Sequence, residues 1–178
     1  MGAGLGGGSA DGAFMLKLLN DKFHLHLSTD QLTVYAVQLG SDCPFFIVNQ
    51  PSYATGRGEN LEPISLSLSG YQLVIENPCI HIDTGKAFSQ LDLNTAQNKH
   101  SHLKQVIQRP VSEWKENLNN DFEIPVFQQY PQIKAIKEKF YAEGALYAAM
   151  SGSGSTVYGL FKKSVAMKPV IGRVLVNF

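Results

Sequence analysis

The first ten residues of the chain are the ones whose types and spacing point most clearly to chemistry. Met1–Ala10 has the sequence Met-Gly-Ala-Gly-Leu-Gly-Gly-Gly-Ser-Ala, which places five glycines in the first eight residues. Glycine adopts positive φ angles and lacks a Cβ atom, so successive backbone N–H groups can converge on phosphate oxygens. The run Ala10–Phe23 has helical spacing, and a helix N-terminus adds unpaired N–H donors and a partial positive charge. The segment therefore predicts a phosphate-binding loop.

Three other glycine-rich loops share parts of this pattern but require different neighbours. Gly2, Gly4 and Gly7 fit the dinucleotide fingerprint, yet that fingerprint needs a strand on each side, and here a second helix follows the first. The Walker loop needs a lysine directly before its serine, and that position holds Gly8. The protein-kinase loop lies between antiparallel strands and does not begin a helix. A flexible tail or simple tight turn stays open as the alternative, because short glycine motifs also match by chance.

The elements that must position this loop predict an α+β chain. After Ala10–Phe23, Ser28 begins a second helix with Gln31 in a capping-box arrangement, and Gly40 is placed to end it. Pro131 begins a later, well-defined helix. Apolar periodicity and turn residues predict strands at 45–48, 52–55, 71–76, 146–150 and 156–161, helices at 85–91, 111–118 and 121–130, turns at 56–59 and 151–155, and a polar loop at 94–102.

Size, charge and cysteine content limit the class of protein. A chain of 178 residues can build one substantial core or two small ones. Its 15 basic residues balance 15 acidic ones, so we expect neither a nucleic-acid surface nor a membrane surface. Two cysteines make no disulfide framework, and the His24/His26 and His100/His102 pairs lack a third metal ligand at suitable spacing. With no signal peptide and no long apolar run, the sequence predicts a soluble cytoplasmic protein.

Two further segments occur together with such a glycine loop in a known family. Gly40–Phe46 is Gly-Ser-Asp-Cys-Pro-Phe-Phe, and Met150–Ser155 is Met-Ser-Gly-Ser-Gly-Ser. With Met1–Ala10 they resemble motifs of the GHMP kinases, and within that superfamily they are similar to the family of 4-diphosphocytidyl-2-C-methyl-D-erythritol kinases. The resemblance extends from Met1 to about Lys163. It implies a two-layer α+β GHMP kinase fold and ATP- and Mg²⁺-dependent phosphorylation of the 2-hydroxyl of 4-diphosphocytidyl-2-C-methyl-D-erythritol, in non-mevalonate isoprenoid precursor biosynthesis.

The resemblance also implies that Asp42 is the catalytic base, which would accept the proton of the substrate hydroxyl. A solvated aspartate in a turn is the alternative for such a residue. We expect Pro44 to hold Cys43 in an extended conformation and so to constrain the turn that carries Asp42. Ser9 would contact a phosphate oxygen or Mg²⁺, or would act only as the N-cap of the first helix.

The substrate side of the implied site lies in two later segments. Phe88 would stack on the cytosine from a short helix that begins after Asp83, and a core phenylalanine is the alternative. The Gly-Ser-Gly turn would support the glycine loop and the substrate pocket, or be an ordinary hairpin turn. The implied ATP-binding residues are Met1, Gly2, Ala3, Gly4, Leu5, Gly6, Gly7, Gly8, Ser9 and Ala10, the implied substrate-binding residues are Thr84, Phe88, Gly152, Ser153 and Gly154, and no residue is assigned as a direct metal ligand.

The family has a further segment before the glycine loop, with a lysine-bearing strand and an aromatic–histidine pair for the cytosine, and neither is found here. We therefore expect residues 1–70 to be the remainder of an N-terminal ATP-binding domain and residues 71–178 to be the C-terminal domain. The chain alone should have little kinase activity. A non-catalytic nucleotide-binding remnant, or a GHMP kinase for another small alcohol, stays open as the alternative.

Overall fold

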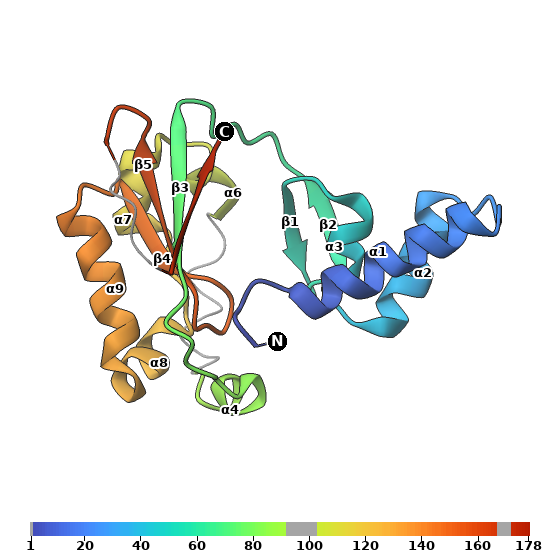
Figure 1. Ribbon diagram of the computed structural model, residues 1–178, viewed down its shortest axis with the longest axis horizontal. Coiled ribbons are helices and arrows are strands. Elements are labelled where there is room, and N and C mark those ends of the chain that lie inside the picture. Colours follow the sequence, from blue (N-terminus) through green and yellow to red (C-terminus); the bar gives the residue numbers. More distant parts are fainter. Residues whose placement is uncertain (1, 92–102, 167–171) are drawn as a thin grey trace. The chain divides into compact units, whose positions relative to one another are not determined.

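The computed structural model describes residues 2–91, 103–166 and 172–178, so Met1 and the predicted loop at 94–102 lie outside the described residues. The chain divides into two compact units (Figure 1). The first is Gly6–Leu66, and the second combines Gly2–Leu5 with Ser67–Phe178. The chain therefore passes from the second unit into the first inside the glycine-rich segment, and each unit has a hydrophobic core of its own.

Three helices build the first unit: α1 (Gly7–Lys22), α2 (Thr29–Leu39) and α3 (Cys43–Val48). The predicted capping box is confirmed, because Ser28 Oγ accepts a hydrogen bond from Gln31 N at 3.3 Å and Gln31 Oε1 accepts one from Ser28 N at 2.9 Å. The predicted end of α2 at Gly40 is also confirmed. The helices share a core of Ala13, Leu32, Ala36, Cys43 and Ile47.

Helix α3 replaces the strand predicted at 45–48, and that prediction was wrong. The aromatic and β-branched residues of this segment favour a strand locally, but tertiary packing decides such short segments. Cys43 and Ile47, one helical turn apart, are buried in the shared core. Pro44 lies in the first turn of α3, where its missing N–H costs no hydrogen bond. The expected extended conformation at Cys43 was therefore also wrong.

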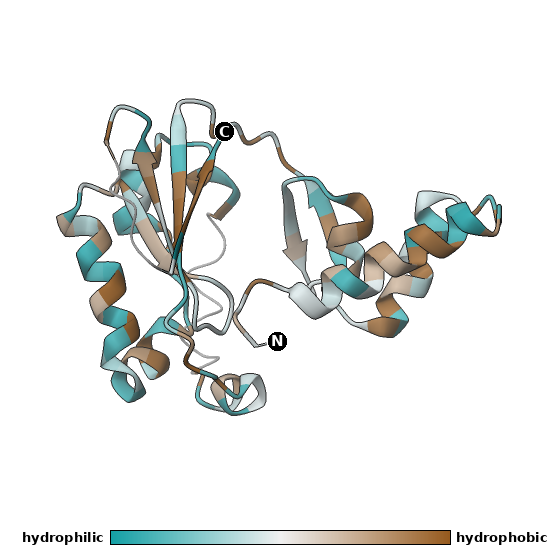
Figure 2. Cartoon of the chain, in the orientation of Figure 1, coloured by the Kyte–Doolittle hydropathy of each residue, from teal (hydrophilic) through white to brown (hydrophobic). Residues whose placement is uncertain are grey.

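Helix α1 carries apolar residues on two sides. Ala13 is fully buried in the core. The opposite side forms two adjacent i, i+4 rows whose side chains are 38 to 62% exposed, and Figure 2 shows the apolar colouring along this helix. We call this set the α1 apolar stripe; its members are Phe14, Met15, Leu18, Leu19 and Phe23. A surface helix normally carries polar residues on the side that faces away from the core, so an exposed apolar stripe on that side is unusual.

The rest of the first unit is a hairpin of β1 (Ser52–Thr55) and β2 (Asn60–Pro63). The strand predicted at 52–55 and the turn at 56–59 are confirmed. Inside the turn, Glu59 Oε2 accepts a hydrogen bond from Arg57 N at 2.6 Å. Backbone N–H donors of this kind hold the pKa of the Glu59 carboxyl below its ordinary value.

The second unit contains an antiparallel sheet in the order β4-β5-β3-β6. Its strands are β3 (Tyr71–Glu76), β4 (Tyr147–Met150), β5 (Val157–Lys162) and β6 (Arg173–Asn177). The first three were predicted, and β6 was not. Arg173 fixes β6 to its neighbours, because its guanidinium pairs with Glu76 at 2.6 Å and with Glu143 at 2.8 Å.

Helix α9 (Pro131–Ala142) packs on β4 and β5 (Figure 1). Phe140 meets Phe161 edge to face with ring centroids 6.0 Å apart. Gly159 makes room for this pair, because a Cβ there would lie 3.0 Å from Phe140. The other helices of the unit are α4 (Thr84–Ser89), α6 (Leu103–Val106), a 3₁₀ turn (Val111–Glu113), α7 (Trp114–Asn117) and α8 (Glu123–Gln129). The helices predicted at 85–91, 111–118 and 121–130 are confirmed near these positions, whereas α6 was not predicted.

Candidate functional site

The first half of the glycine segment is held by the second unit. Ala3 O accepts a hydrogen bond from Thr156 N at 3.2 Å, and Gly4 O accepts one from Ser151 Oγ at 2.7 Å. Gly4 has a φ of 75°, and a Cβ at this position would lie 2.1 Å from Ser151 O. Glycine is thus required at position 4 for two reasons, the left-handed backbone and the close approach of the two segments.

The second half of the segment is the N-terminus of α1. Gly6 is the N-cap with a φ of 66°, and Ala10 N donates to Gly6 O at 2.9 Å to close the first turn. The alternative that Ser9 is only the N-cap of this helix was wrong, since Ser9 lies inside the first turn. The N–H groups of the residues before Ala10 have no partner within a helix. A Cβ on Gly7 would meet no atom within 4 Å, so the space beside this residue is open, and N–H groups at a helix N-terminus are a common binding site for phosphate.

The Gly-Ser-Gly turn brings predicted substrate residues together. Ser153 Oγ lies 3.1 Å from Thr84 Oγ1, within hydrogen-bond distance. Asp83 caps α4, as predicted, by accepting a hydrogen bond from Lys86 N at 3.0 Å. Gly154 has a φ of 97°, and a Cβ on it would lie 2.6 Å from Ile82 Cδ1. The turn and the start of α4 therefore form one polar cluster.

Phe88 lies beside this cluster and is 59% exposed, so it is not a core residue. Its ring meets Phe122 edge to face at a centroid distance of 4.9 Å. Phe88 also lines a cavity of about 470 Å³ together with Tyr147, Ser151 and Gly152. An exposed aromatic face next to a cavity can stack against a planar ring of a ligand.

Asp42 belongs to the first unit, together with Gly6–Ala10. It is the N-cap residue of α3, its side chain makes no capping hydrogen bond, and it is exposed. The Asp42 carboxylate borders the backbone of Gly58, where a Cβ would lie 2.9 Å from Asp42 Oδ1. The carboxylate is thus open to a ligand, as a proton acceptor must be.

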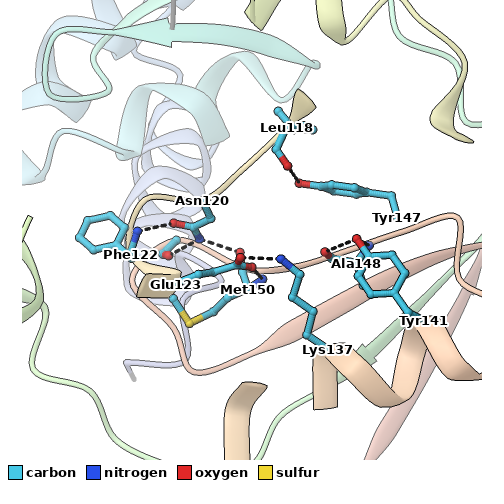
Figure 3. Close-up of polar contacts among 10 residues, drawn as sticks. Leu118, Asn120, Phe122, Glu123, Lys137, Tyr141, Tyr147, Ala148 and Met150 are labelled. Atoms are coloured by element: carbon cyan, nitrogen blue, oxygen red, sulfur yellow. Dashed lines mark hydrogen bonds and ion pairs between the residues drawn. The ribbon is translucent and has the colours of Figure 1, made fainter. Parts of the chain in front are cut away.

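Sequence reasoning missed two residues that hold the Gly-Ser-Gly turn, Asn120 and Glu123. Asn120 Nδ2 donates to Met150 O and Gly152 O, both at 2.8 Å, and Glu123 Oε1 accepts from Met150 N at 2.8 Å (Figure 3). The signal available in the sequence was an asparagine just before a helix and a glutamate between apolar residues. Neither signal predicts a hydrogen bond to a residue about 30 positions away.

The described ranges contain no group of three or more His, Cys, Asp or Glu side chains that could hold a metal ion. Cys43 and Cys79 are both free thiols. Among the described helices, none is long and apolar enough to cross a bilayer.

The glycine loop, the Asp42 turn and the Gly-Ser-Gly turn occur together in one class of proteins. Residues 1–50 match the model of the GHMP kinases N-terminal domain, and residues 103–174 match the model of the GHMP kinases C-terminal domain. The chain belongs to the GHMP kinase family, whose members are small-molecule kinases, and the predicted family and α+β fold are confirmed.

Its relatives identify the branch of the family. The chain is 58% identical over 160 residues to the 4-diphosphocytidyl-2-C-methyl-D-erythritol kinase of Bacteroides fragilis, covering 90% of this chain and 57% of that protein. It is 52% identical over 167 residues to the kinase of the same name from Parabacteroides distasonis, covering 94% and 60%. The chain is thus a homologue of these kinases and spans somewhat more than half the length of the curated relatives it matches.

Solved structures agree with this assignment. A crystal structure of 4-(cytidine 5'-diphospho)-2C-methyl-D-erythritol kinase superposes with a TM-score of 0.73 at 28% identity, covering 89% of this chain and 57% of that one. Homoserine kinase from Cytophaga hutchinsonii has a TM-score of 0.68 at 17% identity, covering 92% and 58%. The second likeness shows the fold alone.

Proposed function

We propose that this chain supplies the glycine loop, the base and part of the substrate site of a kinase. The enzyme transfers the γ-phosphoryl group of ATP, with Mg²⁺, to the 2-hydroxyl of 4-diphosphocytidyl-2-C-methyl-D-erythritol. The observation that carries the proposal is the bond from Ser151 Oγ to Gly4 O at 2.7 Å, which ties the glycine segment to the Gly-Ser-Gly turn. The names of the most similar relatives support the choice of substrate.

The residues present fit a nucleotide phosphate. The start of α1 offers unpaired backbone N–H groups and the positive end of the helix dipole, with open space beside Gly7. ATP supplies the transferred phosphoryl group, and Mg²⁺ neutralises the charge on its oxygens. Ser9, in the first turn, is the hydroxyl available for a phosphate oxygen or for Mg²⁺.

The acceptor side of the reaction needs a base and a pocket. Asp42 is exposed and makes no capping bond, so its carboxylate is available to take the proton of the substrate hydroxyl. The exposed ring of Phe88 offers a stacking surface for the cytosine. The hydroxyls of Thr84 and Ser153, 3.1 Å apart, offer hydrogen bonds to the same ligand.

The experiment uses a hybrid enzyme in which this chain replaces the matched part of the Bacteroides fragilis kinase. ADP formation is measured with ATP, Mg²⁺ and 4-diphosphocytidyl-2-C-methyl-D-erythritol, and the phosphorylated product is identified by mass spectrometry. We expect turnover by the hybrid and little by the chain alone. A hybrid that prefers homoserine or mevalonate, or that binds nucleotide without turnover, would overturn the proposal.

A base substitution tests the mechanism. Asp42→Asn in the hybrid should lower kcat about 10²- to 10⁴-fold, the usual contribution of a general base, without changing the unfolding curve. Asp21→Asn is the matched control, because Asp21 is an exposed aspartate of the same unit. Equal kcat values for the two variants would remove Asp42 from the mechanism.

A further inference from the structure

Strand β4 is an edge strand of the described sheet, since its only partner there is β5. Alternate backbone groups of β4 therefore point away from the sheet, and an unpaired edge is normally covered by other groups. At Ala148 the cover is the Tyr141 hydroxyl, which accepts from Ala148 N at 3.1 Å and donates to Ala148 O at 3.2 Å. Side chains thus take the place of a fifth strand along this edge (Figure 3).

At the end of the strand nearest the Gly-Ser-Gly turn, the cover is Glu123 and Asn120. Glu123 Oε1 accepts a hydrogen bond from Met150 N, and Asn120 Nδ2 donates one to Met150 O. Asn120 then reaches past the strand, because the same Nδ2 also donates to Gly152 O at 2.8 Å. Its own orientation is fixed by Phe122 N, which donates to Asn120 Oδ1 at 3.0 Å.

Glu123 is an anchored group rather than a mobile one. It is only 7% exposed, and its Oε2 pairs with Lys137 Nζ of α9 at 2.5 Å. A buried carboxylate without a partner is costly, and Lys137 Nζ supplies that partner for Glu123. A charged acceptor makes a stronger hydrogen bond to Met150 N than a neutral one would. The backbone just before the turn is therefore clamped to both α8 and α9.

The turn that follows carries the contacts of the proposed site. Ser151, next to Met150, holds Gly4, and Ser153, next to Gly152, meets Thr84. Asn120 bonds the carbonyls directly before each of these two serines. A small shift of Asn120 would thus move both serine hydroxyls together.

We propose that Asn120, supported by the Glu123–Lys137 pair, is a positioning residue that sets the Ser151–Gly154 turn in its ligand-binding conformation. This inference rests on the proposed function and adds to it a residue that acts through the backbone carbonyls of Met150 and Gly152. The side-chain amide nitrogen of Asn120 donates to Met150 O and Gly152 O, whereas its side-chain oxygen accepts the local hydrogen bond from Phe122 N. The two roles can therefore be separated by mutation.

The test variant is Asn120→Asp, which keeps the acceptor for Phe122 N but turns the donor into an oxygen that repels the two carbonyls. The matched control is Tyr141→Phe, which removes the cover of the same edge two residues before Met150. Amide hydrogen exchange is followed by NMR at Gly154 N, which bonds Ser151 O at 3.0 Å, and at Ala148 N. We expect Asn120→Asp to speed exchange at Gly154 roughly thirtyfold, as the loss of two hydrogen bonds allows. Tyr141→Phe should speed exchange at Ala148 and leave Gly154 unchanged.

The functional consequence is measured as the dissociation constants for ATP with Mg²⁺ and for 4-diphosphocytidyl-2-C-methyl-D-erythritol. We expect Asn120→Asp to weaken at least one of them about tenfold and Tyr141→Phe to change neither. Unchanged exchange at Gly154, or equal effects of both variants, would overturn the inference. Faster exchange with unchanged affinities would overturn it as well. Failure of the wild-type chain to bind either ligand would instead count against the proposed function, and the exchange result would then decide the positioning role by itself.

Discussion

The substitution Gly4→Ala is the sharpest test of how the glycine segment is held. The added Cβ would lie 2.1 Å from Ser151 O and 2.9 Å from Gly154 O. Ordinary contact begins at 3.4 Å, so the segment would have to move away by roughly 1.3 Å. That shift breaks the bonds Ser151 Oγ to Gly4 O and Thr156 N to Ala3 O. The left-handed backbone adds strain of about 1–2 kcal/mol for any residue with a Cβ.

The size of the effect follows from how the segment is attached. Two hydrogen bonds contribute about 2 kcal/mol in total. Gly2–Leu5 can detach without unfolding the sheet of the second unit, so strain beyond that amount is relieved by detachment. We therefore expect the unfolding free energy of the second unit to fall by no more than about 2 kcal/mol, while Thr156 N loses its partner.

The assay combines urea unfolding with amide exchange at Thr156. Gly7→Ala is the control, because a Cβ on Gly7 meets nothing within 4 Å. We expect fast exchange at Thr156 in Gly4→Ala and wild-type exchange in Gly7→Ala. A Gly4→Ala protein that matches Gly7→Ala in both measurements would refute the account of the segment as docked on the turn.

Three further changes have outcomes set by the structure. Burial raises the pKa of the Tyr147 hydroxyl above its ordinary value of 10.0. The stabilisation from this hydroxyl is therefore complete below pH 10.0 and is lost as the pH rises further. On going to about pH 11, the unfolding free energy measured in urea should fall more for wild type than for Tyr147→Phe. Arg173→Met leaves the partly buried Glu76 without its 2.6 Å partner and should lower the unfolding free energy by about 2–3 kcal/mol, and an unchanged urea midpoint would contradict this. Ser28→Ala removes the acceptor for Gln31 N and should lower the free energy of thermal unfolding by about 1 kcal/mol, more than the exposed control Ser69→Ala does.

Local sequence signals correctly predicted the helices and strands whose formation depends on residues within the element itself. Ser28 with Gln31 predicted the start of α2, Pro131 predicted the start of α9, and alternation predicted β3 and β5. These signals act within a few residues, through capping bonds, fixed φ angles and side-chain periodicity. The glycine loop and the two partner motifs predicted the family for the same reason, since each motif is a short, contiguous run.

The secondary-structure predictions failed where contacts with residues distant in the sequence determine the conformation. The segment of α3 has the composition of a strand and became a helix because Cys43 and Ile47 pack into a core made by α1 and α2. Strand β6 was missed because its place depends on Arg173, which pairs with Glu76 nearly a hundred residues earlier. A short segment with no strong local preference takes the structure that its neighbours in space allow.

The sequence by itself determined which reactive and binding groups are present: a glycine loop that can bind phosphate, an aspartate that can accept a proton, and a Gly-Ser-Gly turn that can support the glycine loop. Only the tertiary structure decided how these parts are held. The bond from Ser151 to Gly4, the Thr84–Ser153 pair and the clamp of Asn120 and Glu123 on Met150 join residues that are 27 to 147 positions apart. Residue types and local spacing are written in the chain, but contacts of this range form only when the second unit packs its sheet against α8 and α9.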